Sequence, residues 1–235
     1  KVYDLIKVRR ILIINIKDKI CTLFMVLLIS MNCAPITSDM QSAKTAGQGG
    51  LEITMNVGAL LMDSDDEMAQ TEGSVQDNRG GSIAYGIRNN VDVRARFESI
   101  RVPSMEELGD EAPSYSLMSF GIKYGILEDR LAFYLPYSIY NTDQEDTDPA
   151  NIIAPTLLYT ASIGDAFEIT PSVKYLIPIG DIADDSDPGL AYNLGFGYQL
   201  LGKFTLRAEW GQYIPGGDAE ITFSQTSFGL TYKLK

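Results

Sequence analysis

The sequence predicts an all-β fold: a single antiparallel, up-and-down transmembrane β-barrel of about ten strands, preceded by a cleaved signal segment. Three observations support this prediction. Apolar and polar residues alternate from Leu51 onward, short turns alternate with longer connections, and an apolar run precedes the alternating part. The alternating segments are about ten residues long, which is the length that a tilted strand needs to cross a bilayer.

The N-terminal region has the anatomy of a signal peptide. Lys17 and Lys19 precede an apolar run from Ile20 to Ile29, a charged region followed by a hydrophobic one. A membrane-spanning helix needs roughly 20 apolar residues, so this run is too short to be an anchor. Residues 1–16 do not begin with Met and are interpreted as upstream read-through. We therefore expect read-through plus signal peptide over 1–33, a periplasmic linker over 34–50 and the barrel over 51–235.

The cysteines are confined to this N-terminal region. Cys21 and Cys33 are the only two in the chain, so the predicted barrel has no disulfide framework and no thiolate metal site. Cys33 ends the sequence Ser30-Met31-Asn32-Cys33, which resembles a lipoprotein lipobox, except that Asn32 occupies a position where a small residue is expected. The residues are compatible with lipidation of Cys33 and equally with ordinary cleavage nearby.

Ten alternating segments follow the linker. They cover residues 51–62, 80–88, 91–102, 114–126, 131–141, 151–163, 167–179, 189–200, 204–214 and 220–234. Tight turns at 89–90, 127–130, 164–166 and 201–203 predict the periplasmic end, and longer connections predict the outer end. An even number of strands places both termini on the periplasmic side of a bacterial outer membrane. Prolines 136, 155 and 171 remove ladder donors and are expected at bulges or strand ends.

The two faces of the segments differ in chemistry. Over 189–200, large apolar and aromatic residues occupy one face, and small or polar residues occupy the other. Across the segments the polar face carries a row of charged residues: Arg94, Arg96, Glu98, Lys123, Lys174, Arg207 and Glu209. A water-soluble barrel also alternates, but this mixture of opposite charges and glycines favours a crowded polar lumen and an apolar wall facing lipid.

Charge and composition narrow the function classes. The chain has a formal net charge of −12 and no histidine, which argues against a nucleic-acid partner and removes the commonest general base and metal ligand. The long connections hold most of the carboxylates, in clusters that include Asp63-Asp65-Asp66-Glu67, Asp143-Glu145-Asp146-Asp148 and Asp181-Asp184-Asp185-Asp187. Solvated loops explain these clusters, since none follows the helix-loop-helix calcium pattern. Divalent ions that bridge the loops to lipopolysaccharide are a further hypothesis. We predict no metal site and no cofactor.

Two stretches carry a resemblance to a known class of proteins. Ser227 to Leu234 resembles the C-terminal β-signal for outer-membrane insertion, with Gly229, Tyr232 and Leu234 at its defined positions. Met40 to Gly47, followed by Gln48, two glycines and the first strand, is similar to the start of small Gram-negative outer-membrane β-barrel, or porin-like, family proteins. The resemblance implies location and fold only, because the family has no shared catalytic residues. At that location we expect outer-membrane lipid and lipopolysaccharide as partners, and the barrel-assembly machinery during insertion.

Three functions are then compatible with the sequence. The first is a non-enzymatic structural or surface-exposed barrel, whose charged lumen residues pair and fill the interior. The second is a narrow channel for small solutes, including apolar ones that leave sideways through the wall. The third is an outer-membrane enzyme such as an omptin-like protease or an esterase, for which the chain offers neither a histidine nor a Gly-x-Ser-x-Gly elbow.

Overall fold

The structure is a computed structural model that describes residues 36–64, 75–102, 114–142, 147–183, 186–200, 202–217 and 221–234. The chain divides into two compact units, Lys1–Ile36 and Thr37–Lys235, and the description below concerns the second. The predicted signal peptide and Cys33 lie outside the described residues. So do most residues of the acidic clusters in the long connections.

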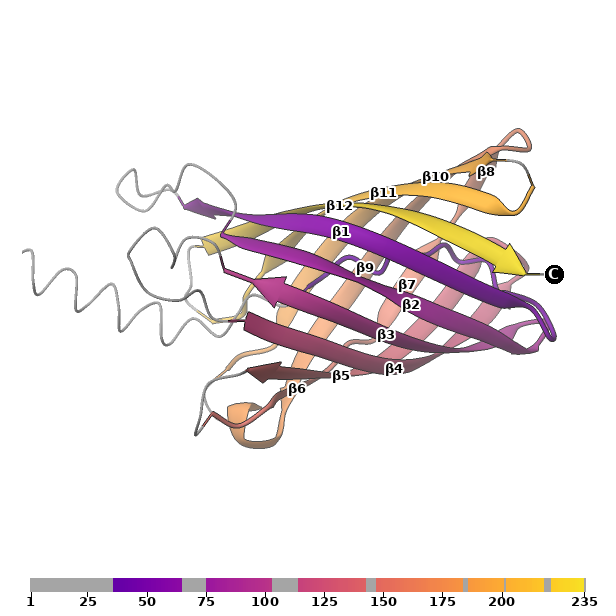
Figure 1. Cartoon of the computed structure of the whole chain (residues 1–235). Coiled ribbons are helices and arrows are strands. Elements are labelled where there is room, and N and C mark those ends of the chain that lie inside the picture. The colour runs from indigo at the N-terminus through magenta and orange to yellow at the C-terminus, as the bar shows by residue number, and fades with distance from the viewer. Residues whose placement is uncertain are drawn as a thin grey trace, which may run out of the picture. The chain divides into compact units, whose positions relative to one another are not determined.

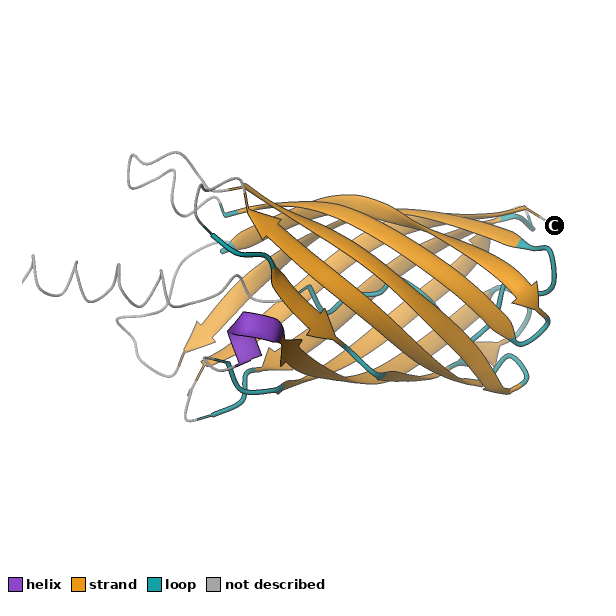
Figure 2. Cartoon of the chain, turned by 90° about the horizontal axis from the view of Figure 1, so that it is seen from below, coloured by secondary structure: helices purple, strands orange, loops and turns teal. Residues whose placement is uncertain are grey.

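The second unit is a closed antiparallel barrel (Figures 1 and 2). Its strands are β1 (Leu51–Ser64), β2 (Gln76–Arg88), β3 (Val91–Arg101), β4 (Ser114–Leu127), β5 (Leu131–Thr142), β6 (Ala150–Ile153), β7 (Thr156–Tyr159), β8 (Ala161–Ile163), β9 (Phe167–Ile179), β10 (Gly189–Leu200), β11 (Phe204–Ile214) and β12 (Ile221–Leu234). Consecutive strands pair from β1 to β6 and from β8 to β12, while β6 and β7 each pair with both β5 and β9. β12 returns to pair with β1 from Leu51 opposite Leu234 to Ser64 opposite Ile221. β6, β7 and β8 lie end to end between β5 and β9 and together form one interrupted strand. Counted in this way, the barrel has ten strands, as predicted.

The interrupted sixth strand breaks at Pro155, between β6 and β7, in agreement with the expectation that this proline ends a strand. Pro136 and Pro171, by contrast, lie inside the continuous strands β5 and β9, so the expectation of bulges or strand ends is wrong for them. Pro136 has no N–H to offer across the β5–β6 boundary, and the Ala154 carbonyl accepts a hydrogen bond from Thr156 Oγ1 instead, at 2.8 Å. A side-chain hydroxyl thus substitutes for a missing ladder donor.

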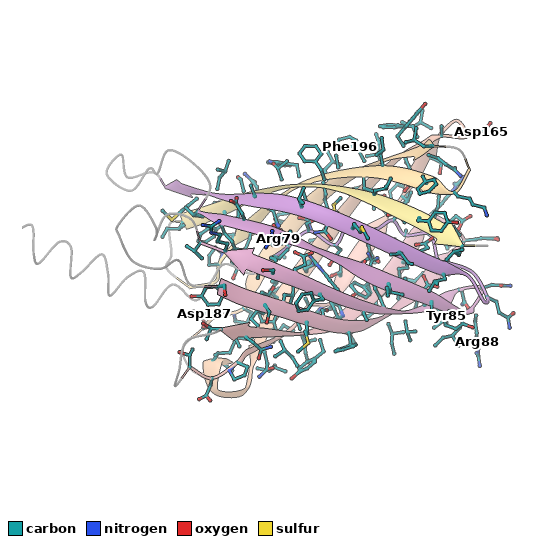
Figure 3. All side chains as sticks on the ribbon, in the orientation of Figure 1. Arg79, Tyr85, Arg88, Asp165, Asp187 and Phe196 are labelled. Carbon is teal, nitrogen blue, oxygen red and sulfur yellow. The ribbon has the colours of Figure 1, made fainter. Side chains whose placement is uncertain are left out.

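The two faces of the wall are chemically opposite. The outward face carries large apolar side chains that stay exposed, such as Met55 at 70% and Phe228 at 58%, and Figure 3 shows Phe196 projecting from the outside of the barrel. The inward face carries buried polar and charged side chains. A water-soluble barrel has the reverse arrangement, because it must bury its apolar face. The wall therefore has the distribution of a membrane barrel.

The two ends of the barrel also differ. Four turns of two or three residues join β2 to β3, β4 to β5, β8 to β9 and β10 to β11 at one end, where β1 begins and β12 ends (Figure 1); we call this the tight-turn end. The longer connections lie at the opposite end, the long-loop end.

β2 begins at Gln76, earlier than predicted, so Arg79 belongs to the outward face of the wall and not to a loop. The structure describes one helix, the single 3-10 turn η1 (Gly180–Ala183), and within the described ranges no helix is long and apolar enough to cross a membrane.

Candidate functional site in the barrel lumen

The seven charged residues predicted for the polar face all lie on the inward face of the barrel. Arg94, Arg96 and Glu98 belong to β3, Lys123 to β4, Lys174 to β9, and Arg207 and Glu209 to β11. Their side chains are buried or nearly so, from 0% exposure for Glu98 to 11% for Arg207. The period of two along each strand is the cause, because it directs every second side chain into the interior. We refer to this interior as the lumen.

A stretch of chain that precedes β1 lies inside the lumen. Residues 37–50, here called the lumen segment, contact inward side chains of the wall at a series of levels, and the indigo trace inside the barrel in Figure 1 follows the same course. Ala46 N donates to Asp92 at 3.0 Å, Ala43 N to Thr160 at 2.8 Å, and Thr37 N to Gln225 at 2.9 Å. Residues 37–50, predicted above as part of a periplasmic linker, therefore lie against inward side chains of the wall.

The order of these contacts gives the direction of the lumen segment. Asp92 is one residue from the start of β3 at the tight-turn end, whereas Gln225 is nine residues from Leu234 on β12. At about 3.3 Å per residue, nine residues of a tilted strand span roughly 20 Å along the barrel axis. The segment thus runs from Gly50 at the tight-turn end toward the long-loop end as it is followed back to Thr37.

Glycines make the sharp turn that joins the lumen segment to β1. Gly47 and Gly49 have φ values of 76° and 72°, a left-handed conformation that only glycine adopts without strain. Gly50 N donates to the Gly47 carbonyl, and Gly49 N donates to the Gly86 carbonyl on β2, both at 2.8 Å. A Cβ on Gly86 would lie 1.8 Å from the Gly47 oxygen. The absence of side chains lets the turn pack directly on the wall.

Wall side chains bind the backbone donors of the lumen segment. The carboxylate of Glu209 accepts from Asp39 N at 3.0 Å and from Met40 N at 3.1 Å, and Gln225 Oε1 accepts from Thr37 N and Ser38 N at 2.9 and 3.1 Å. Met40 has a φ of 48°. Left-handed residues of this kind place successive N–H groups on one side of the backbone, where they bind an anion.

Wall lysines and arginines bind the backbone acceptors of the same segment. Lys123 Nζ donates to the carbonyls of Ser42 and Lys44, and Lys174 Nζ to that of Thr37 at 2.7 Å. Arg94 donates to the Asp39 carbonyl at 3.1 Å and to Gln41 Oε1 at 2.9 Å. An extended chain inside a lumen cannot pair with neighbouring strands, so the wall side chains satisfy its buried backbone groups.

Ion pairs join the lumen segment to the wall at two levels. Asp39 lies 3.3 Å from Arg96 Nη1 and 2.8 Å from Lys174 Nζ. Nearer the tight-turn end, Lys44 pairs with Glu168 at 3.0 Å, and Glu168 also pairs with Arg207 at 2.9 Å. The side chains of these ion pairs are at most 11% exposed, apart from that of Lys44 at 35%. Water therefore screens the attraction between the charges only partly.

Other lumen charges pair within the wall itself. Glu98 is fully buried and accepts from Arg96 Nε at 2.7 Å, Asn56 Nδ2 at 2.8 Å and Asn78 Nδ2 at 2.6 Å. Lys123 pairs with Asp92 at 3.4 Å. These contacts satisfy a buried carboxylate on several sides, which a buried charge requires.

Asp39, Asp92, Glu168 and Gln225 are lumen residues that the prediction of a site did not include. Asp92 and Glu168 occupy polar positions of alternating segments, so the period of two could have identified them. Asp39 lies in a segment without periodicity, and its ion-pair partners on the wall, Arg96 and Lys174, are far away along the chain. Sequence spacing offers no signal for such a contact.

The three residues of the predicted insertion signal lie on β12, the strand that closes the barrel. Gly229 faces the lumen, where a Cβ would lie 2.6 Å from the Met55 carbonyl oxygen. Tyr232 packs on Phe204 with ring centroids 4.8 Å apart, and Leu234 pairs with Leu51. Their role in insertion stays a prediction. In the described ranges, no group of three or more His, Cys, Asp or Glu residues is arranged to hold a metal ion.

Comparisons with known proteins add to this geometry at the level of the fold. No protein-family model and no curated protein sequence matches the chain. Among solved structures, the outer membrane channel COG4313 from Pseudomonas putida F1 is similar with a TM-score of 0.51 and 8% identity, over 86% of this chain and 100% of that chain. The outer membrane protease OmpT from Escherichia coli has a TM-score of 0.46 and 10% identity, over 79% and 97% of the two chains. The closed barrel and the similarity to the COG4313 channel together give the chain the fold of the bacterial outer-membrane β-barrels.

Proposed function

We propose that the protein is a non-enzymatic outer-membrane barrel, structural or surface-exposed, whose lumen is closed by its own segment of residues 37–50. The contacts between that segment and the wall carry the proposal. They reach wall residues on β3, β4, β9, β10, β11 and β12, so the segment is held on several sides of the lumen. A ten-stranded barrel has an interior only slightly wider than one that side chains fill, and an additional chain leaves little room for solute.

The other parts of this proposal rest on the sequence and on the pairing of the lumen charges. The chain has no histidine, and its lumen charges are engaged with one another or with the lumen segment, which leaves no free general base at the centre of the described barrel. The long connections are acidic and are proposed to face the cell exterior, where they would contact lipopolysaccharide. The C-terminal strand is proposed to bind the barrel-assembly machinery during insertion.

Single-channel recording in planar bilayers tests the closure. The full-length protein should give no steady openings, or only rare small ones, while remaining folded as judged by heat-modifiable migration on gels. Lys123→Gln together with Lys174→Gln removes the contacts of both lysines with Thr37, Asp39, Ser42 and Lys44 and should raise the frequency of openings. Steady large openings of the unaltered protein would contradict the closure.

A narrow channel is the second candidate, and two observations favour it. Four buried side-chain atoms of the lumen, Ser38 Oγ, Gln41 Nε2, Asn193 Oδ1 and Ser227 Oγ, have no hydrogen-bond partner in the described part of the chain. Buried polar atoms of this kind are usually satisfied by water, so the lumen beside the segment is polar enough to be wet. On the outer wall, an apolar groove of about 690 Å³ crosses β2 to β6, a suitable surface for an apolar solute. Small, stable openings of the unaltered protein would favour this candidate over a closed barrel.

A further inference from the structure

The carboxylate of Asp39 lies among three cationic side chains of the wall. Lys174 Nζ is 2.8 Å from Oδ2 and Arg96 Nη1 is 3.3 Å from Oδ1, while Arg94 Nη2 donates to the main-chain carbonyl of the same residue. Arg94, Arg96 and Lys174 are 6%, 9% and 3% exposed. We call these three residues the basic cradle. They come from β3 and β9, strands far apart in sequence that approach each other through the lumen.

The basic cradle depends on the lumen segment for its anion. Lys174 donates to the Thr37 carbonyl and pairs with Asp39, so both contacts come from the segment. Arg94 likewise binds Gln41 and the Asp39 carbonyl. Glu98 stays engaged with the wall, where Asn56, Asn78 and Arg96 donate to it. Glu209 binds the backbone N–H groups of Asp39 and Met40 and is released together with the segment, so the three cations of the cradle then face two wall carboxylates. Withdrawal of the segment would therefore leave uncompensated positive charge midway along the lumen.

We propose that the basic cradle is a binding site for the carboxylate of a small organic anion, with Asp39 as its resident intramolecular ligand. Arginine and lysine together recognise carboxylates through short charge-assisted hydrogen bonds, and rings of such residues select anions in pores. The proposal rests on the closure proposed above and adds the class of solute: when the lumen segment withdraws, small carboxylates pass through the cradle that Asp39 had occupied.

Asp39→Asn in the full-length protein is the first test. The substitution keeps the size of the side chain and removes its charge, so both ion pairs are lost. Single-channel recording should show more frequent openings than in the unaltered protein, and the reversal potential in a KCl gradient should report a preference for chloride over potassium of about tenfold, the ratio expected from roughly one unit of charge near the path. Potassium succinate should block the chloride current.

A pair of lysine variants distinguishes binding at the basic cradle from a general effect of positive charge on the protein. In the Asp39→Asn background, Lys174→Gln should raise the half-blocking concentration of succinate by about tenfold and weaken the chloride preference, as loss of one close charge predicts. Lys203→Gln is the matched control, because it removes the same charge from an exposed side chain at the tight-turn end. It should leave both quantities unchanged. Heat-modifiable migration checks that each variant is folded.

The outcomes distinguish the two proposals. An unaltered protein that is already open and anion-selective contradicts the closure and supports the cradle. A cation-selective Asp39→Asn channel, or equal effects of Lys174→Gln and Lys203→Gln, overturns the cradle. If Asp39→Asn stays closed, Asp39→Arg places a third positive charge against Arg96 and Lys174 and should expel the segment; two closed variants overturn the role of Asp39.

Discussion

The most demanding single position in the lumen is Glu98. Its carboxylate is fully buried and is held by one arginine and two asparagines. A buried charge is tolerated when its partners surround it. When the charge is removed, the partners remain buried without compensation and destabilise the fold. Individual lumen charges thus contribute chiefly by satisfying one another, so the loss of one member exposes the others.

Glu98→Ala should lower the stability of the barrel by about 3–5 kcal/mol, because Arg96 loses its wall partner and remains buried. The measurement is the denaturant midpoint of the protein in detergent, or the temperature at which its compact gel band disappears. Glu128→Ala removes the same charge from an exposed position in the β4–β5 turn and should change stability by less than about 0.5 kcal/mol. Equal effects of the two substitutions would show that the buried network does not matter for stability.

Individual lumen residues are predictable where they belong to strands. The period of two along the sequence assigns Arg94, Arg96 and Glu98 to one face, and the same rule covers Lys174 on β9. It fails for Asp39, because a segment without strand pairing has no period, and for the partnership of Asp39 with Lys174, because nothing local connects them. Alternation also separates two faces without saying which one is inside, so the exposure of the apolar face decides between a membrane barrel and a soluble one.

Among the elements, the strands follow the sequence pattern closely and the lumen segment does not. Nine of the predicted segments differ from the observed strands by at most two residues at either end, with β6 to β8 counted as one strand. The agreement is close because the alternation of apolar and polar residues stops where each strand ends. β2 starts four residues before its predicted start, because Gln76 and Asn78 are polar yet face the polar lumen. The lumen segment resembles a linker in composition, and only its contacts with the wall distinguish it from one.

The turn at Gly47 to Gly50 gives a test of how the lumen segment is held. Gly86→Ala would place a Cβ 1.8 Å from the Gly47 carbonyl oxygen, so backbone must move and the turn must detach from β2. We expect frequent openings in single-channel recording, with the heat-modifiable band retained. Gly125→Ala is the control, since its Cβ would meet Thr45 Cγ2 at 3.5 Å, an ordinary contact. Openings that are equally rare in both variants would mean that the turn does not anchor the segment.

We predict the orientation of the barrel across the membrane from its two unlike ends. Outer-membrane barrels place short turns in the periplasm and long loops outside. Asp165 is exposed in a turn at the tight-turn end and Asp187 is exposed near the long-loop end, at opposite ends of the molecule in Figure 3. Intact cells treated with a membrane-impermeant maleimide should therefore label Asp187→Cys. Asp165→Cys should react only after the outer membrane is permeabilised.

The unsubstituted protein sets the background in this experiment, because the chain carries Cys21 and Cys33. The reverse pattern, with Asp165→Cys labelled in intact cells and Asp187→Cys protected, would invert the barrel. Inversion would also place the acidic connections in the periplasm, away from lipopolysaccharide. It would leave the basic cradle intact, since Arg94, Arg96 and Lys174 lie between the two ends, and a carboxylate would then reach the cradle from the cell exterior through the tight-turn end.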